Sequence, residues 1–375
     1  MYWEIVMSIS ELPLVNAKVP FDAPVQSGIE QPGPAHLSVL AFDLKDAVGA
    51  PELQELMKDW TLRARNLTQG GTIEGFRERE MVQVIANLTI TCGFGERIFD
   101  LLGKSELKPD GLHPIPAFKT DRLDPKWGQS DLVLQICCDD LVTLTTAARM
   151  MIKAAAPYAQ MKWRQRGFGR AYGAAEVGAT PRNPMGSLDG TVNPKTPEEY
   201  AEQVWIDSDA PYLNNSSIMV IRRISLNLDA WDRIDDERRN RVIGRDLHTG
   251  APLSGGESEF DEEDMDAVGP DGKYLIDRHS HLALSREQDG LPNDALRRRA
   301  YSYDDPLESD FLTTNAGLVW IAFQKNPDKQ FTAIQKRLDE ADLLNHFIRH
   351  IGSAVYWIVP GTTPDSYWGE ALFSA

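Results

Sequence analysis

The chain has 375 residues, of which 42% are hydrophobic and 25% are charged, a balance typical of a soluble globular protein. Its formal net charge of -17 argues against a nucleic-acid partner, because phosphates would be repelled by an acidic surface. No apolar run approaches about twenty residues, so we expect no membrane span. The length exceeds that of a usual single domain and predicts two domains or a duplicated unit.

The N-terminal residues 1–34 are proline-rich and weakly patterned, which predicts an arm laid on the surface. They contain no basic segment followed by a long apolar core and no twin arginine, so we expect no export signal and a cytoplasmic protein. Export by the twin-arginine route is the alternative if a signal has been removed. The three cysteines, Cys92, Cys137 and Cys138, have neither zinc nor disulfide spacing and are expected to be buried apolar residues.

The first half of the chain alternates between β-branched or aromatic runs, which favour strands, and segments with apolar residues at helical spacing. The predicted order is strand 36–44, helix 51–66, strand 87–93, strand 131–138, helix 140–155 and strand 158–165. This order is the split βαβ pattern of a ferredoxin-like unit.

The second half repeats this pattern around a long insertion. The predicted elements are strand 217–228, helix 229–242, strand 317–324, helix 330–338 and strand 354–360. An irregular insertion spans 244–310, and loops of such length are usually functional or disordered. We therefore predict an α+β protein of two ferredoxin-like units, with an N-terminal arm at 1–34, one domain at 35–165 and a second at 166–375 that contains the site.

The stretch 180–194 has three prolines and two glycines, which predicts a loop. At its centre Gly186, Asp189 and Gly190 form a Gly-x-x-Asp-Gly unit. Glycines on both sides of a carboxylate suggest a backbone that bends tightly or approaches a large flat group. An ordinary β-turn is the alternative.

Two further segments contain residues suited to chemistry. His279 and His281 form a His-x-His pair without an accompanying carboxylate or cysteine ligand set, but one imidazole suffices as an axial ligand of haem iron. Residues 297–299 are three arginines followed by alternating aromatics. They are either a solvated face leading into a strand, or one guanidinium points into a pocket while the others bind propionate-like carboxylates.

Taken in order, these motifs identify a family resemblance. The matching segments are QPGPAHL at 31–37, LTITCGFG at 88–95, AFKTDRLDP at 117–125, RGFGR at 166–170, the loop 180–194, RRAYSYD at 298–304 and LNHFIRHIGSA at 344–354. The chain resembles the dye-decolourising peroxidases over nearly its whole length, within them the group that includes exported iron-transport-associated peroxidases. The resemblance implies two ferredoxin-like domains with haem b bound in the second.

The resemblance also implies roles for single residues. Asp189 corresponds to the distal acid-base residue, His281 to the proximal iron ligand and Arg298 to the distal arginine. His279 and Arg299 are the alternatives for the last two. Gly190, Thr191 and Val192 are expected along the haem edge.

Ala283 stands where the family usually has an arginine, so Arg286 is expected to compensate at the haem propionates. Asp342 is a candidate partner for the proximal histidine.

The expected activity is reduction of hydrogen peroxide with oxidation of a dye, phenol or similar organic reductant. Asp189 would move a proton between the peroxide oxygens, and Arg298 would stabilise the developing negative charge. Surface residues could relay electrons, with Trp320, Tyr301 and Tyr303 as candidates, although aromatic residues in strands more often belong to the core. Two alternatives stay open: a haem-handling protein with little turnover, and a cofactor-free α+β interaction protein. A homo-oligomer is a further expectation that sequence leaves open.

Overall fold

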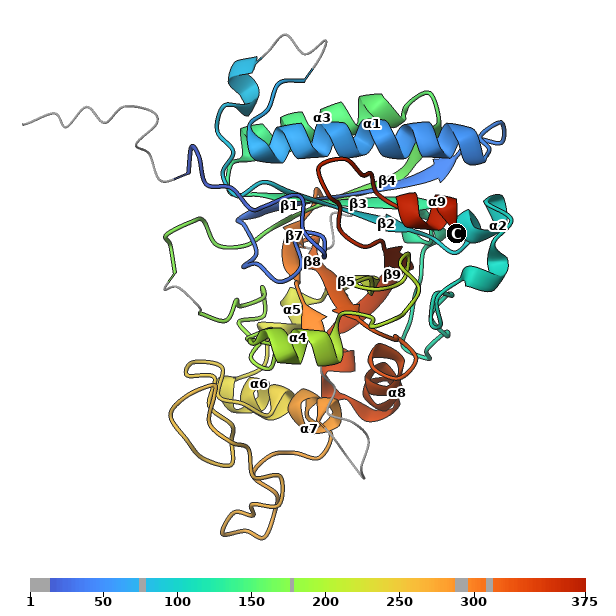
Figure 1. Ribbon diagram of the computed structural model, residues 1–375. Coiled ribbons are helices and arrows are strands. Elements are labelled where there is room, and N and C mark those ends of the chain that lie inside the picture. Colours follow the sequence, from blue (N-terminus) through green and yellow to red (C-terminus); the bar gives the residue numbers. More distant parts are fainter. Residues whose placement is uncertain (1–13, 74–78, 176–178, 287–295, 308–312) are drawn as a thin grey trace, which may run out of the picture.

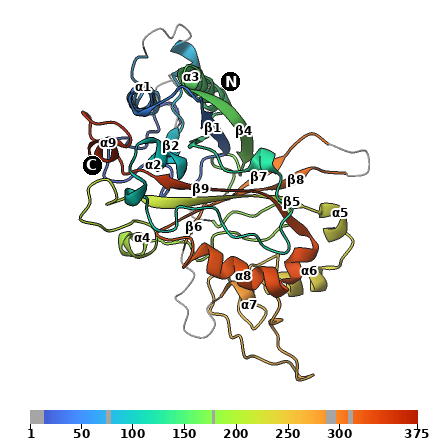
Figure 2. The same ribbon diagram turned by 90° about the vertical axis from the view of Figure 1, so that its right-hand side faces the viewer.

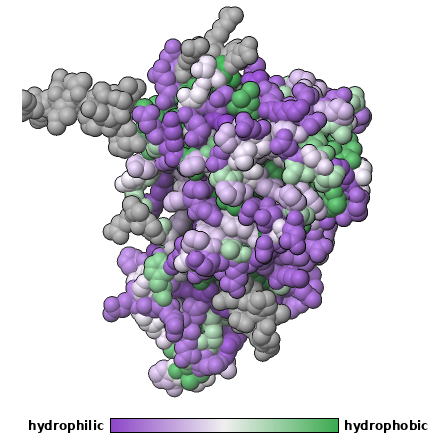
Figure 3. All heavy atoms as spheres, in the orientation of Figure 1, coloured by the Kyte–Doolittle hydropathy of each residue, from purple (hydrophilic) through white to green (hydrophobic). Residues whose placement is uncertain are grey.

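The computed structural model describes residues 14–73, 79–175, 179–286, 296–307 and 313–375. The molecule is layered, with two long helices on one side, two β-sheets in the middle, and short helices and loops on the other side (Figures 1 and 2). The face seen in Figure 3 is mainly hydrophilic, in keeping with the net charge of -17. Within the described residues, no helix is both long and apolar enough to cross a membrane.

The N-terminal sheet has the strand order β2-β3-β1-β4, which is the order of a ferredoxin-like unit. Its strands are β1 (His36–Leu44), β2 (Thr89–Phe94), β3 (Leu132–Cys138) and β4 (Ala159–Phe168), and its helices are α1 (Ala50–Gln69) and α3 (Leu141–Ala155). Pro51 lies in the first turn of α1, which tolerates proline because its N–H groups have no helical partner. The Asp140 side chain caps α3 by accepting from the Thr143 N–H. All six predicted elements are confirmed.

The C-terminal sheet repeats this order as β7-β8-β5-β9, with β6 also pairing along β8. Its strands are β5 (Ser217–Leu226), β6 (Arg297–Arg298), β7 (Tyr301–Asp304), β8 (Ala316–Gln324) and β9 (Ile348–Ile358), and its principal helix is α8 (Phe331–Ala341). The single helix predicted at 229–242 is instead two helices, α5 (Leu228–Trp231) and α6 (Asp236–Ile243). Asp235 caps α6 in an extended conformation, so the helix begins anew there.

The remaining elements are short. They are α2 (Arg97–Leu101), α4 (Pro197–Gln203), α7 (His281–Ser285), α9 (Glu370–Ser374), and the 3₁₀ helices η2 (Arg79–Val82), η3 (Ser105–Leu107), η4 (Pro125–Trp127) and η5 (Leu343–His346). The prediction that 244–310 is irregular throughout is wrong, because α7, β6 and β7 lie within it. Residues 287–295 and 308–310 of that insertion lie outside the described residues.

The two sheets join at both edges. β2 pairs with β9 at Gly93 and Phe94, and β4 pairs with β7 at Phe168, while β5 pairs with both β8 and β9 inside the second sheet. The strands therefore form a closed ring around a shared apolar core. Tyr301 and Tyr303 lie in this core and are 4% and 1% exposed, so they are core residues of their strand, as the alternative had it, and not surface relays.

The described part of the N-terminal arm is built into the molecule. Gln26 is buried, and its side-chain amide donates to the carbonyls of Cys92 and Val359 and accepts from the Cys92 N–H. Ile29 is fully buried between the sheets. The expectation of an arm merely laid on the surface is therefore wrong for residues 26–29, and residues 1–13 lie outside the described residues. The three cysteines are free and buried, as predicted.

Candidate active site

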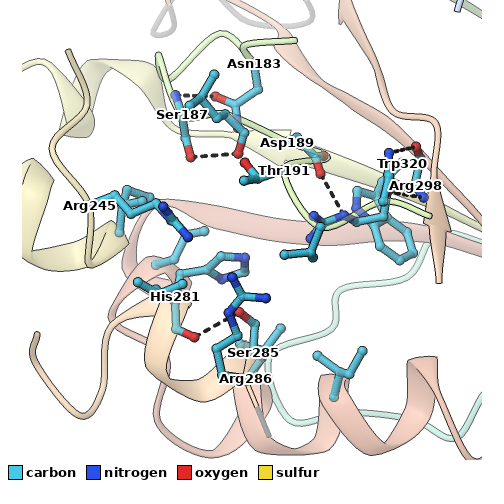
Figure 4. Close-up of a pocket in the computed structure, with 18 of the residues that line it drawn as sticks. Asn183, Ser187, Asp189, Thr191, Arg245, His281, Ser285, Arg286, Arg298 and Trp320 are labelled. Atoms are coloured by element: carbon cyan, nitrogen blue, oxygen red, sulfur yellow. Dashed lines mark hydrogen bonds and ion pairs between the residues drawn. The ribbon is translucent and has the colours of Figure 1, made fainter. Parts of the chain in front are cut away.

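A cavity of about 830 Å³ lies between the C-terminal sheet, helices α7 and α8, and the loops that precede β5 and follow α6. This volume is within the range of about 300–1,000 Å³ typical of cofactor pockets. Figure 4 shows His281 on one side of this space and Asp189 with Arg298 on the other. The three residues singled out from sequence all line the cavity, although they come from α7, a loop and β6.

His281 is fixed to the end of α8 through its imidazole. It is the first residue of α7, whose N-cap Ser280 accepts from the Ala283 N–H. His281 Nδ1 lies 2.7 Å from Asp342 Oδ2, and the Leu343 N–H donates to the His279 carbonyl over 3.0 Å. Asp342 itself is 1% exposed. The expected partnership between Asp342 and the histidine is therefore present.

This contact determines which nitrogen faces the cavity. An ionised carboxylate can only accept, so Nδ1 of His281 carries the proton and donates to Asp342. Nε2 then keeps its lone pair, and the ring is 35% exposed because it borders the cavity. Burial alone would lower the pKa of His281, but the charge and hydrogen bond of Asp342 outweigh it and raise that pKa. Such an imidazole is suited to bind a metal.

The alternative histidine lies elsewhere. His279 is 62% exposed, approaches Asp277 at 3.6 Å, and does not line the cavity. The two rings of the His-x-His pair therefore do not point the same way, because the chain turns into α7 between them rather than continuing as a strand.

The loop that holds Asp189 is fastened by its own polar groups. The Asn183 side-chain oxygen accepts from the backbone N–H of Met185 and Ser187. The guanidinium of Arg182 donates to the carbonyls of Gly186, Leu247 and His248. The loop predicted from its prolines and glycines is confirmed, and Arg182 links it to the segment after α6.

Asp189 is directed at an arginine. Its Oδ1 lies 3.2 Å from Arg298 Nε, and the two side chains are 16% and 23% exposed. Gly190 follows with φ +123°, a conformation that other residues rarely adopt. Thr191 donates to Glu259 over 2.8 Å, and Thr191 and Val192 both line the cavity, whereas Gly190 supplies the bend.

The three arginines of 297–299 divide between two faces of the strand, because side chains alternate along it. Arg298 points into the cavity. Arg297 donates to the carbonyls of Ile29 and Gln31, and Arg299 donates to those of Gln31 and Pro32. The interpretation that one guanidinium enters a pocket agrees with this arrangement, but the neighbouring arginines hold the N-terminal arm and not cofactor carboxylates.

A second charged group on the cavity wall was not found from sequence. Glu263 forms ion pairs with Arg286 and with Arg245, the latter at 3.2 Å. Ala283 is buried on the other side of α7 beside Ile276, so this position does not supply an arginine to the cavity. Arg245 and Arg286 are the arginines placed near that wall. The acidic run at 257–266 was the only sequence signal for Glu263.

A third group, Asp121, Arg222 and His350, was also missed. Arg222 is buried, forms an ion pair with Asp121 and donates to His350 Nδ1 over 2.8 Å. Burial, assisted by the charge of Arg222, holds the pKa of His350 well below its usual range. Arg222 and His350 line the cavity. No periodicity links residues this far apart in the chain, so sequence alone could not assemble them.

The residues present fit a haem. Within the described residues, no cluster of three or more His, Cys, Asp or Glu could hold a metal ion by itself, but a haem iron needs only one axial imidazole. The cavity offers the Nε2 side of His281, a volume suited to a cofactor, and arginines that can pair with carboxylates.

Comparisons with known proteins agree with this arrangement. Residues 26–169 match the family model described as Dyp-type peroxidase, N-terminal, and residues 180–363 match Dyp-type peroxidase, C-terminal. A dye-decolorizing peroxidase of Thermobifida fusca is 34% identical over 363 residues, covering 92% of this chain and 83% of that protein. A deferrochelatase of Escherichia coli is 31% identical over 376 residues, covering 95% and 88%.

A solved structure shares the fold. Ferric DtpA from Streptomyces lividans superposes with a TM-score of 0.92 and 32% identity, covering 96% of this chain and 98% of that one. The predicted α+β fold of two ferredoxin-like units and the predicted haem cofactor are thereby confirmed. The chain belongs to the Dyp-type peroxidases, which are haem enzymes that use hydrogen peroxide to oxidise a reductant.

Proposed function

We propose that His281 is the axial ligand of haem b, and that Asp189 and Arg298 activate hydrogen peroxide on the opposite side of the cavity. The observation behind this proposal is the direct contact between Asp189 and Arg298 at 3.2 Å across the cavity from the Asp342-bound imidazole. A protein that only binds haem needs the imidazole but has no use for an acid-base group paired with a cation.

Each residue has a separate task. When bound, haem supplies the iron that accepts electrons from the reductant and delivers them to peroxide. Asp189 takes a proton from one peroxide oxygen and returns it to the other, which becomes water. The Arg298 guanidinium stabilises the negative charge on the departing oxygen. Asp342 keeps Nδ1 of His281 protonated and its ring oriented.

Residues on two sides of the cavity are proposed to contact the edge of the haem and its propionates. We place Gly190, Thr191 and Val192 at the haem edge, because Thr191 and Val192 line the cavity and Gly190 supplies the bend before them. Arg286, together with Arg245, is the proposed partner of the propionates. Glu263 binds both arginines, so these guanidinium groups are already oriented before a propionate arrives.

The reductant is proposed to be a dye, a phenol or a similar organic molecule. Trp320 lines the cavity and packs against Phe331 with ring centroids 5.3 Å apart. It is therefore the candidate among the predicted aromatics for passing an electron toward the cavity.

The domain division predicted at residue 165 falls inside β4 (Ala159–Phe168) of the N-terminal sheet, so we propose that the haem-binding domain begins after this strand and extends to 375. Cytoplasmic location, export by the twin-arginine route, and assembly into a homo-oligomer stay predictions. Fractionation of the native host distinguishes the two compartments, and light scattering of the purified protein gives the oligomeric state.

Haem handling is the second candidate function, because several relatives, among them the one from Escherichia coli, are named deferrochelatase. The absorption spectrum of haem-loaded protein, followed in a stopped-flow instrument after one equivalent of hydrogen peroxide, separates the two. A Soret band that shifts rapidly and returns when a phenol or dye is added supports the peroxidase. A band that only bleaches supports the carrier.

Replacing Asp342 by asparagine is expected to weaken haem binding without abolishing it. A neutral amide makes the His281 imidazole less basic, so haem should dissociate about 10–100-fold faster, and the iron reduction potential should rise. Transfer of haem to apomyoglobin and spectroelectrochemistry measure these effects. Asp328→Asn is the matched control, since it breaks a similar contact of 2.9 Å with His113 at the surface. Equal dissociation rates for wild type and Asp342→Asn would contradict the prediction.

A further inference from the structure

One side chain joins the Asp189 loop to the strand that holds Arg298. Asn193 Nδ2 donates to the Arg298 carbonyl over 2.8 Å, and the Arg298 N–H donates to Asn193 Oδ1 over 2.9 Å. We call these two hydrogen bonds the amide clamp. They are the pair of bonds that a neighbouring strand residue would make.

The clamp completes an otherwise bare strand edge. Arg299 donates its N–H to the Ile321 carbonyl of β8 over 2.8 Å. Because the backbone groups of successive strand residues point to opposite edges, the N–H and C=O of Arg298 point away from β8. Asn193 satisfies both groups, and an unpaired backbone group at a part-buried position would be costly.

Asn193 is also hydrogen-bonded to the backbone that directly follows Asp189. The Asn193 N–H donates to the Gly190 carbonyl over 2.9 Å, which closes a turn directly after Asp189. A side chain at Gly190 would meet Asn193 Nδ2 at 2.9 Å, and its φ of +123° also favours glycine. A movement of Asn193 on β6 would therefore move Asp189 relative to Arg298.

The ion pair between Asp189 and Arg298 cannot hold this geometry throughout the reaction. Partly exposed ion pairs contribute little to stability, and the proposed proton transfer makes Asp189 neutral for part of the cycle. The amide clamp is uncharged on both sides, so protonation of Asp189 does not weaken it. It acts on the backbone of Arg298 and leaves the guanidinium free to face peroxide.

We propose that Asn193 is a positioning residue for the peroxide reaction, which holds Asp189 and Arg298 in register whether or not Asp189 is charged. This inference rests on the proposed function of that pair. When Asp189 is neutral and the ion pair is weakened, the uncharged amide of Asn193 keeps the two residues aligned.

The test begins with haem-loaded Asn193→Ala. Haem content should be unchanged, because the variant leaves His281 and Asp342 in place, whereas the second-order rate constant with hydrogen peroxide should fall about 10–100-fold, as expected for a small misplacement of reacting groups. The KM for the reductant should not change. Hydrogen exchange of the Arg298 amide should accelerate. The control is Asn315→Ala, which removes a single hydrogen bond from the Asn315 side-chain amide to the Pro306 carbonyl. This variant should react like wild type.

A double-mutant cycle with Arg298→Leu decides whether Asn193 acts through that residue. If it does, adding Asn193→Ala to Arg298→Leu should slow the reaction little further. A wild-type rate for Asn193→Ala, with Arg298→Leu slow, would overturn the inference while leaving the proposed function intact. A full additional loss in the double variant would also overturn it. A wild-type rate for Arg298→Leu would overturn the proposed role of Arg298 and this inference together.

Discussion

Replacing His281 by alanine is expected to abolish haem retention. The cavity contains one imidazole that is oriented by a buried carboxylate and keeps its Nε2 lone pair toward the space. Without it, the described wall offers arginines for the propionates and the imidazole of His350, whose Nδ1 lone pair already accepts from Arg222. Purified His281→Ala, expressed with added haem, should lack the Soret band that the wild-type protein shows. Added imidazole should restore part of that band by occupying the vacated ring position.

His279→Ala is the matched control, because His279 is exposed and lies outside the cavity lining. This variant should retain haem like the wild type. Loss of the His281 ring also leaves the buried Asp342 without one hydrogen-bond donor, at a cost of about 1–3 kcal/mol, so circular dichroism of the apoproteins should establish that both variants fold. A normal Soret band in a folded His281→Ala variant would rule out His281 as the iron ligand.

The parts of the fold that could be predicted are those whose pattern is local. β1, β3 and β5 are almost entirely buried runs rich in Leu, Ile and Val, and α1 and α3 show apolar residues at helical spacing with proline or aspartate at their starts. Their order was enough to indicate a duplicated ferredoxin-like unit.

The parts that could not be predicted depend on distant partners. β6 has two residues and exists as a strand only because β8 and Asn193 pair with its two edges. The arm at 26–29 has no strand or helix pattern, yet it is buried because Gln26 satisfies backbone groups of Cys92 and Val359. Such contacts join residues far apart in the chain, and sequence periodicity does not predict them.

The candidate site shows the same division. Asp189, His281 and Arg298 were selected because their flanking sequences match a family, and the structure places all three around one cavity. The contacts of Arg297 and Arg299 were not predictable. Alternation along a strand predicts that their side chains face away from that of Arg298, but it does not identify the groups that they bind. Glu263 belongs to an acidic run whose residues cannot be distinguished by sequence alone. Only the structure shows that Glu263 forms ion pairs with Arg245 and Arg286.

Replacing Asp189 by asparagine is expected to leave haem in place while slowing the reaction with hydrogen peroxide by about 10²–10⁴-fold. The amide has nearly the shape of the carboxylate and its oxygen can still accept from Arg298, so the loop should stay where it is. It cannot accept a proton from peroxide, however, and that transfer is the task assigned to Asp189. The rate of the Soret change, measured at several peroxide concentrations, gives the second-order constant.

Asp22→Asn is a suitable control, since it alters a comparable ion pair, with Arg65 at 2.8 Å, that does not line the cavity. It should react with peroxide at the wild-type rate. If Asp189→Asn also reacted at that rate with its haem content intact, proton transfer would have to be assigned to another group. Two of the other acids that line the cavity, Glu259 and Glu263, are engaged with Thr191 and with arginines, and variants at these two positions would test whether either carries the proton.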